Sequence, residues 1–318
     1  MELRGRNILI TGCAGFIASH LAEELLERGN KVVGVDNFSA GKREFMSNML
    51  THPDFSFIEG DLLTMDLVPA LKDVDVICHF AANPDVRLGA KNTHIHFEQN
   101  IEVTYRLLEA GKDLEVEDIM FPSTSTVYGE TEVIPTPENY GPLVPISVYG
   151  ASKLACEALI ASYCHTFDQN AVIYRFANVV GTRSTHNVLH DFIRKLREDP
   201  SSLEILGAEP GTIKSYVHVK DCVQGMVAGA EASEEQVEIY NIGSKDWMTV
   251  KDIADIVTEE MGLPDAEYRW TGGVKGGRGW VGDVKKMLLS VEKLQSRGWN
   301  PRLSSREAIR QAVREILS

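Results

Sequence analysis

The chain has 318 residues, of which 43% are hydrophobic and 25% charged, and its net charge is −14 at pH 7. This length and composition predict a folded protein with a full core and exclude the charge-rich, apolar-poor signature of a disordered chain. The acidic balance, without a concentrated run of Lys or Arg, argues against a nucleic-acid partner, because binding to the phosphate backbone needs a basic face.

The spacing of the cysteines and the hydropathy of the chain indicate the cellular compartment. The five cysteines are scattered and form no CxxC or Cys/His spacing, so we expect reduced thiols and no structural metal. No apolar run approaches the ~18 residues that a membrane-spanning helix needs, and the start of the chain lacks a secretory leader pattern. We therefore expect a cytoplasmic protein without a membrane partner.

Short apolar runs alternate with helical patterns through the first half of the chain. Runs of β-type composition cover residues 7–11, 31–36, 55–60, 74–80, 118–123 and 171–181. Helical patterns such as residues 16–29 separate them. Such alternation needs right-handed crossovers and predicts an α/β fold, a Rossmann-type doubly wound parallel sheet with helices on both faces.

After about residue 181 the pattern changes to longer loops, rich in Gly and Pro, and shorter helices over residues 219–230 and 250–261. We expect residues 1–180 to form a cofactor-binding domain and residues 181–318 to form a smaller, mainly substrate-binding region. Whether residues 238–243 rejoin the sheet stays an open question.

Small residues follow the first expected strand at a characteristic spacing. Gly12, Gly15 and Ala18 form a GxxGxxA pattern between that strand and an amphipathic helix. Glycines let the backbone approach a pyrophosphate, whose charge the free N–H groups at the helix start can bind. This context predicts a dinucleotide site. Other residues of this loop that we expect to contact the cofactor are Ala14, Phe16 and Ile17.

Asp36 ends the second expected strand, roughly 20 residues beyond the glycines, where an acidic side chain accepts hydrogen bonds from the adenosine ribose. A carboxylate here repels a 2′-phosphate, so the pattern favours NAD over NADP. Ligands of such sheets bind at the carboxyl ends of the strands. Further cofactor contacts are therefore expected at Asn37, Ser39, Gly41, Asp61, Leu62, Phe80, Ala81 and Ala82.

Tyr149 and Lys153 are four residues apart at the start of a helical pattern, so they should share one face of a helix. A free tyrosine, with a pKa of about 10, is a poor base at neutral pH, but a neighbouring ammonium favours the phenolate. Tyr149 can then exchange a proton with a sugar hydroxyl while hydride passes between that carbon and a nicotinamide. Lys153 would also hold the nicotinamide ribose.

With these motifs the chain resembles the extended short-chain dehydrogenase/reductase family and, within it, the UDP-glucose 4-epimerase branch. The resemblance is carried by TGCAGFIASHL, VDNFSAGKRE, GDL, HFAANPDVR, NIEVTYRLLEA, PSTSTVYGE, YGASKLACE, YRFANVVG and SYVHVKD. It implies that Thr124 completes a catalytic trio with Tyr149 and Lys153, and that Asn100 supports the cofactor region. It also implies contacts with a nucleoside diphosphate at Asn178, Asn187, Val188, Lys214, Tyr216, Arg278 and Asp283. For Thr124, a purely local role as a strand-end hydroxyl bonded to the backbone stays open.

Three departures from the family's pattern concern the ligand contacts. Lys214 stands where relatives usually have an arginine, and lysine gives a point charge without the bidentate fork of a guanidinium. Pro84 stands where some epimerases have a lysine facing the nicotinamide. The segment GGRGWVGDV has two extra residues between Arg278 and the Gly-Asp pair that ends at Asp283.

The residues beside Thr124 distinguish the reactions of the family. Dehydratases that resemble this chain carry Thr-Asp-Glu here, and decarboxylases carry a glutamate immediately before VYG, whereas this chain has Ser125 and Thr126. A keto intermediate would lack a local acid for elimination. The resemblance and these residues together predict an NAD-dependent 4-epimerase that interconverts UDP-glucose and UDP-galactose through a 4-keto sugar.

Other interpretations stay open. The enzyme could act on a UDP-N-acetylhexosamine or a UDP-uronic acid, or could be another nucleotide-sugar dehydratase or decarboxylase, and a different class is a non-catalytic NAD-binding sensor. The resemblance also implies a homodimer through the helix after Asn100 and the helix at Tyr149, packed as a four-helix bundle. Apolar positions left over in residues 101–114 and 153–167 are compatible with this dimer.

Overall fold

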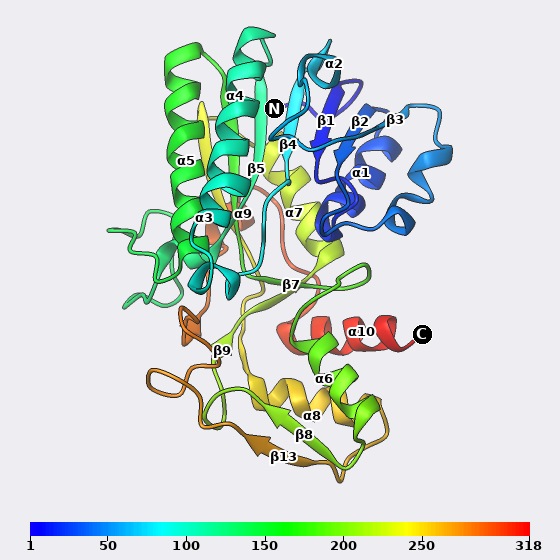
Figure 1. Cartoon of the computed structure of the whole chain (residues 1–318). Helices are drawn as coiled ribbons and strands as arrows, with labels where there is room; N and C mark the ends of the chain where they lie inside the picture. Colours follow the sequence, from blue (N-terminus) through cyan, green and yellow to red (C-terminus); the bar gives the residue numbers. More distant parts are fainter.

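Seven parallel strands form the central sheet of the protein, whose computed structural model describes all 318 residues (Figure 1). The strand order is β11-β6-β5-β4-β1-β2-β3, and every neighbouring pair runs parallel. The predicted doubly wound α/β fold is therefore confirmed. The strands are β1 (Asn7–Thr11), β2 (Lys31–Asp36), β3 (Phe55–Glu59), β4 (Val76–His79), β5 (Asp118–Thr124), β6 (Asn170–Phe176) and β11 (Val237–Ile242).

Helices cover both faces of this sheet because successive strand residues point to opposite sides. Ile8 and Ile10 of β1 belong to an apolar cluster under α1 (Phe16–Glu27) and α7 (Val219–Glu231). Leu9, between them, belongs to another cluster, which includes Val103 and Leu107 of α4 (Val103–Asp113). Beyond α4 on the same face lies α5 (Val148–Phe167), which packs on β5 and β6.

The strand order reverses between β1 and β4, since the chain runs outward from β1 to β3 and then returns to the other side of β1. Connections that leave two adjacent strands in opposite directions open a crevice at their carboxyl ends, which is where such sheets bind ligands. The short elements that precede, separate or follow these strands are η1 (Arg43–Met46), η2 (Met49–Thr51), α2 (Val68–Leu71), η3 (Leu88–Ala90), α3 (His94–His96), the π-helix η4 (Phe97–Glu102) and η5 (Ser125–Tyr128).

A second, smaller part lies below the sheet in Figure 1. It has its own cluster of 17 buried residues, separate from the cluster of 30 under α1 and α7. The chain returns from this part to the central sheet, where β11 pairs with β6. Residues 238–243, for which this question had stayed open, therefore do rejoin the sheet. The remaining elements are β7 (Asn178–Val180), α6 (Val188–Glu198), β8 (Ser202–Ile205), β9 (Ile213–Lys214), β10 (Tyr216–His218), β12 (Met248–Thr249), α8 (Val250–Glu260), β13 (Glu267–Trp270), β14 (Lys286–Met287), α9 (Glu292–Ser296) and α10 (Ser305–Leu317).

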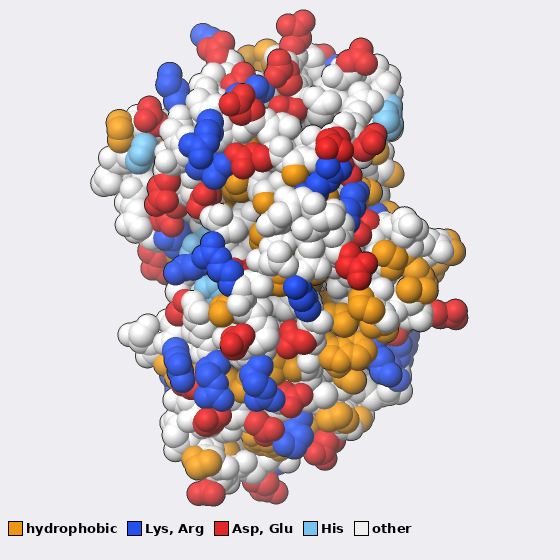
Figure 2. All heavy atoms as spheres, turned by 180° about the vertical axis from the view of Figure 1, so that it is seen from behind, with side chains coloured by type: hydrophobic (Ala, Val, Ile, Leu, Met, Phe, Trp, Pro, Cys, Tyr) orange, Lys and Arg blue, Asp and Glu red, His pale blue; other side chains and the backbone are white.

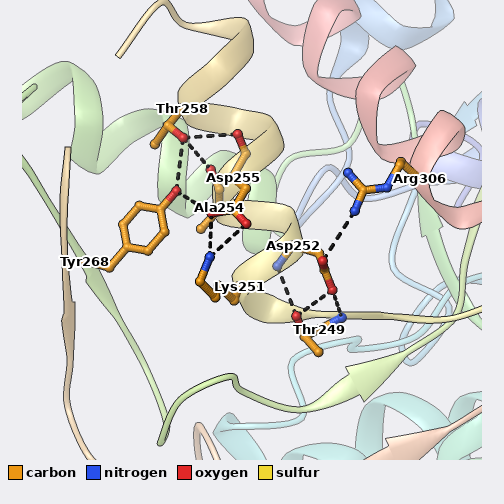
Figure 3. A network of polar contacts seen from close by, with 8 residues as sticks. All are labelled: Thr249, Lys251, Asp252, Ala254, Asp255, Thr258, Tyr268 and Arg306. Atoms are coloured by element: carbon orange, nitrogen blue, oxygen red, sulfur yellow. Dashed lines mark hydrogen bonds and ion pairs between the residues drawn. The ribbon is translucent and has the colours of Figure 1, made fainter. Parts of the chain in front are cut away.

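Polar contacts around α8 join the elements of this smaller part (Figure 3). Thr249 and Asp252 form a capping box at the N-terminus of α8, an arrangement that satisfies two backbone N–H groups at once. The hydroxyl of Tyr268, on β13, donates to Asp255 at 2.9 Å. Arg306 of α10 lies 3.3 Å from Asp252, so α8 is tied to both of its neighbours.

Charges of both signs are interspersed on the face seen in Figure 2, which has no continuous basic area. The row of Lys and Arg side chains over α10 stands beside acidic side chains, in keeping with the ion pairs from Arg310 to Glu259 and Glu260 and from Arg314 to Glu260. Exposed pairs of this kind stabilise a fold by only about 0–1 kcal/mol each. No helix combines the length and the apolar character that crossing a bilayer requires.

His79, at the end of β4, is a buried group whose charge state affects the fold. Its Nδ1 lies 2.8 Å from Thr11 Oγ1 and its Nε2 lies 3.0 Å from Thr104 Oγ1. Burial, and then the nearby charge of Lys153, lower the pKa of His79 to about 3. The imidazole is therefore neutral in the folded protein at any pH where the protein is normally handled.

We predict that stability falls as the pH decreases below the ordinary histidine pKa of 6.5 toward about 3. In that window the unfolded chain binds a proton at His79 that the folded chain does not, which lowers the free energy of unfolding by about 1.4 kcal/mol per pH unit. His79→Gln should therefore show a shallower pH dependence. Urea unfolding at pH 8, 6 and 5 measures the slopes, with His94→Gln at an exposed position as the control; equal slopes in all three proteins would contradict the assignment.

Candidate active site

The glycine loop between β1 and α1 has a backbone that only glycine accommodates at its first position. Gly12 has φ +67°, and a Cβ atom there would lie 2.9 Å from the backbone nitrogen of Ala81. Gly15 is the N-cap of α1 and its N–H donates to the Gly12 carbonyl at 2.9 Å. The loop thus brings β1 and β4 together and leaves the first-turn N–H groups of α1 beside the crevice.

Asp36, at the carboxyl end of β2, is fixed by two backbone donors. One carboxylate oxygen accepts from the N–H of Ala14 at 2.9 Å and the other from the N–H of Phe38 at 2.7 Å. Burial raises the pKa of Asp36, and these hydrogen bonds oppose the increase. Ala14 is fully buried beneath this carboxylate, so it supports the site from behind instead of lining it.

A cavity of about 320 Å³ runs from this glycine loop to α5. Most predicted cofactor contacts line it: Gly12, Gly15, Phe16, Ile17, Asp36, Asn37, Ser39, Gly41, Asp61, Leu62, Phe80, Ala81, Ala82, Tyr149 and Lys153. Glycine backbone, a helix N-terminus, a carboxylate beside the second strand and a Tyr/Lys pair at the far end are the parts that a dinucleotide requires. The residues present therefore fit NAD.

Asn100 lies behind the cavity, in the π-helix η4. Its side-chain oxygen accepts from the N–H of Asn83 at 2.7 Å, and its amide donates to Ser152 Oγ at 2.9 Å. It thereby links the segment after β4 to α5. This supporting position agrees with the role that the resemblance implied, and direct contact between Asn100 and the cofactor stays a prediction.

Several residues that line the cavity were not predicted from the sequence. Some lie at or just beyond the carboxyl ends of strands and could have been found by the rule that located their neighbours, namely Gly60 and Leu63 after β3, Pro122 and Ser123 in β5, Phe176 in β6 and Val179 in β7. Pro84, noted as a departure from relatives, also faces the cavity. By contrast, Ser184, Thr185 and His186 reach it from the loop before α6, for which the sequence offers no comparable signal.

Tyr149 and Lys153 stand on the first turns of α5, which Ser147 caps by accepting from the N–H of Gly150 at 3.0 Å. Lys153 is buried, with Nζ 4.0 Å from the centre of the Phe121 ring. Burial raises the pKa of Tyr149 to about 12 and lowers that of Lys153 to about 8. Burial therefore favours the phenol over the phenolate of Tyr149, and the expectation that Lys153 favours the phenolate stays a prediction.

Thr124 ends β5 and does not line the cofactor cavity. Its hydroxyl accepts from the N–H of Thr126 at 3.2 Å and so caps the short helix η5. The local role that had stayed open is therefore present, and a contact between Thr124 and a sugar stays a prediction. Neither Ser125 nor Thr126 carries a carboxylate. The carboxylate of Glu157, behind them, accepts hydrogen bonds from Ser123 and Arg175.

The residues implied to bind a nucleoside diphosphate lie outside that cavity, in the smaller part. Lys214 forms an ion pair with buried Asp283, and the Arg278 guanidinium donates to the Asp283 carbonyl at 2.9 Å and to Glu130 at 2.7 Å. Asp283 is thus in contact with both Lys214 and Arg278. Tyr216 and Asn178 are register partners on β10 and β7, while Asn187 and Val188 begin α6.

Comparison with known proteins places this geometry in a family. Residues 8–243 match the NAD dependent epimerase/dehydratase family. A putative UDP-glucose 4-epimerase of Methanocaldococcus jannaschii is 30% identical, with 96% of this chain and 97% of the relative covered. A crystal structure of a UDP-galactose 4-epimerase is 40% identical, with a TM-score of 0.86 and 98% of both chains covered. A UDP-glucuronic acid 4-epimerase from Bacillus cereus, solved with UDP-glucuronic acid and NAD, is 30% identical, with a TM-score of 0.88 and 98% and 99% covered.

The chain belongs to the NAD-dependent epimerase/dehydratase family, within the extended short-chain dehydrogenases. It is an NAD-dependent isomerase of the nucleotide-sugar 4-epimerase kind. The family resemblance noted in the sequence, the cofactor and the enzyme class are confirmed by these comparisons.

We predict that Gly12→Ala abolishes NAD binding, because the added Cβ meets the backbone at Ala81 and the loop must move. Gly29→Ala is the matched control, since Gly29 also has positive φ, at +82°, but open space around its Cβ position. Both variants should lose about 1 kcal/mol of stability from backbone strain. NAD released by denaturing the purified proteins measures occupancy. A Gly12→Ala protein with native NAD content would contradict this account of the loop.

Proposed function

We propose that the protein interconverts UDP-glucose and UDP-galactose by inversion at C4, with NAD retained and regenerated in each turnover. The observation that carries the proposal is a Tyr149/Lys153 pair at the end of the cofactor cavity with no carboxylate among residues 124–126. Dehydration or decarboxylation would need an acid or base there. The similarity to proteins described as UDP-glucose and UDP-galactose 4-epimerases supports the same substrate.

The catalytic residues act in the proposal as a proton-transfer unit. Tyr149 accepts the proton of the C4 hydroxyl during oxidation and returns it during reduction. NAD, held by the glycine loop, Asp36 and the other residues that line the cavity, would supply the hydride acceptor and donor, and its oxidised form would bring a positive charge. The Lys153 ammonium lowers the free energy of the phenolate, which burial disfavours. Thr124 donates a hydrogen bond to the C4 oxygen, and its neighbours provide no second acid.

The smaller part holds the nucleotide in this proposal. Residues 1–180 bind the cofactor, and residues 181–318 mainly bind the UDP moiety. Six of the seven residues named from the resemblance belong to this second range, and Asn178 lies just before it. Lys214 and Arg278 are already paired with carboxylates, so an entering diphosphate competes with Asp283 and Glu130 for them. Since hydride must return to the opposite face of the sugar, the sugar has to turn while the diphosphate stays bound.

UDP-galactose conversion by native and Tyr149→Phe proteins tests the function. We expect native protein to form UDP-glucose, and Tyr149→Phe to be slower by roughly 10²–10⁴-fold, because the proton acceptor is gone. Tyr268→Phe removes a hydroxyl outside the cofactor cavity and should leave the rate unchanged. Native protein that carries NAD but forms no UDP-glucose would refute the substrate assignment. Activity with only UDP-N-acetylglucosamine or UDP-glucuronic acid would show that the protein is a 4-epimerase with a different sugar substrate.

We also propose a homodimer through α4 and α5, which lie side by side at the outer edge of the molecule (Figure 1). Tyr105 on α4 and Phe167 on α5 are 47% and 45% exposed. Pairing these helices with those of a second copy would bury both residues and form a four-helix bundle.

The dimer predicts that native protein sediments at twice the chain mass and that Tyr105→Glu sediments as a monomer, because a charge would be buried without a partner. Leu50→Glu places the same charge at an exposed apolar position on η2, at the opposite edge of the sheet, and should stay dimeric. Analytical ultracentrifugation distinguishes these outcomes. A native protein that sediments as a monomer at micromolar concentration would contradict the proposal.

The reducing cytoplasm is the compartment that we propose for this enzyme. All five cysteines are buried and free, and none forms a disulfide. Proteins with this pattern are typical of compartments in which thiols stay reduced.

A further inference from the structure

Residues 182–187, called the strap below, connect β7 to α6 and form one wall of the cofactor cavity. Figure 1 shows the loop after β7 extending toward the part of the fold where α1 begins. The three central residues, Ser184, Thr185 and His186, line the same cavity as Gly12, Gly15 and Phe16. The cavity therefore has a wall that comes from outside the strand–helix unit that carries the glycine loop.

Two side chains of α1 anchor the start of the strap. His20 Nε2 lies 3.1 Å from the carbonyl oxygen of Thr182, and Glu23 forms an ion pair with Arg183 at 2.7 Å. Both residues of this pair are largely buried, with 23% and 19% of their side chains exposed. His20 stands about one turn after Phe16, where α1 begins. The strap is thus fixed beside the first two turns of the helix whose N-terminus faces the cavity.

The far end of the strap is fixed by Asn187. Its side-chain oxygen accepts from the N–H groups of Leu189 and His190 at 2.9 and 3.2 Å, and its amide donates to Ser184 Oγ at 2.7 Å. Between the anchors, Arg183 has φ +65°, a left-handed conformation that a residue with a side chain adopts only where the surroundings enforce it. The strap is therefore held in place by contacts at both of its ends.

The hydrogen bonds within the strap leave donors free to face the cavity. Ser184 Oγ accepts from Asn187, so its own hydroxyl proton is available to a ligand. Thr185 Oγ1 lies 2.9 Å from His186 Nδ1. If Thr185 donates in that contact, the neutral imidazole carries its proton on Nε2. A hydroxyl and an imidazole N–H then stand across the cavity from the N–H groups of α1.

We propose that the strap binds the diphosphate of NAD through Ser184 and His186, opposite the N-terminus of α1, and that the Glu23–Arg183 ion pair is the latch that determines how slowly NAD leaves. Donors on two sides of an anion hold it more firmly than a helix N-terminus alone. The strap is continuous with α6, so the segment that retains the cofactor also leads into the part proposed to bind the nucleotide sugar.

The test measures exchange of bound NAD and does not depend on the sugar substrate. Holoprotein loaded with radiolabelled NAD is mixed with excess unlabelled NAD, and the label that stays with the protein is followed over time. Arg183→Gln and Glu23→Gln each break the latch, and the double variant Glu23→Arg/Arg183→Glu restores an ion pair with reversed charges. His186→Ala tests the contact itself. Arg28→Gln, which breaks the pairs with Glu24 and Glu231 at the other end of α1, is the matched control.

We expect exchange to accelerate at least about tenfold in Arg183→Gln, Glu23→Gln and His186→Ala, which corresponds to a barrier to NAD release that is lower by about 1.4 kcal/mol. The charge-reversed pair should return the rate to within about threefold of native, and Arg28→Gln should exchange at the native rate. Native exchange rates in all latch variants would overturn the proposal, as would equal acceleration in Arg28→Gln. These results hold whether or not UDP-galactose is the substrate, so the two proposals fail independently.

Discussion

The buried ion pair between Glu157 and Arg175 is the interaction on which the catalytic geometry depends. Arg175, on β6, donates to both carboxylate oxygens of Glu157, with the shortest contact 2.7 Å, and neither side chain is more than 5% exposed. Glu157 lies two turns along α5 from Tyr149 and one from Lys153, and it also accepts from Ser123, the residue before Thr124. One carboxylate therefore fixes α5 against the ends of β5 and β6. Removing one partner of such a pair costs about 3–5 kcal/mol, a large share of the roughly 5–15 kcal/mol that stabilises a folded domain.

The same burial that makes this pair rigid determines the acid–base state of the site. Lys153 has lost most of its hydration, and the charge of Glu157, one turn away, offsets part of that loss by raising the pKa of the lysine. Tyr149 receives no comparable help, and burial, with the neighbouring Cys156 as a smaller cause, raises its pKa to about 12. The site thus favours the phenol. In the proposed function, the oxidised form of NAD would supply a positive charge that favours the phenolate, which would couple proton transfer to the cofactor.

Local motifs predicted the parts of the site in which neighbours in sequence are neighbours in space. The glycine loop and the Tyr149/Lys153 pair each depend on one turn or one helix face, and Asp36 lies at the end of the next strand, so their spacing in the sequence located them. The strap was not predictable, because Ser184 and His186 reach the cavity only through contacts between Thr182, Arg183 and a helix about 160 residues earlier in the chain. The raised pKa of Tyr149 was not predictable for a related reason, because sequence spacing shows the neighbouring charge and not the burial around it. The six strands of the first half followed from composition. The pairing of β11 with β6 depends on contacts between distant parts of the chain, which composition does not show.

The cations in the proposed substrate site are also paired with carboxylates. The chain carries a net charge of −14, and an anionic nucleotide sugar would be repelled by that field if no cation met it. Lys214 and Arg278 provide the cations, but Asp283 and Glu130 already neutralise them. In the proposed function the diphosphate gains only the difference between its own contacts and those that it displaces. A compact anion without a nucleoside cannot add contacts elsewhere to make up this difference, so the paired cations favour ligands that fill the whole site over free phosphate.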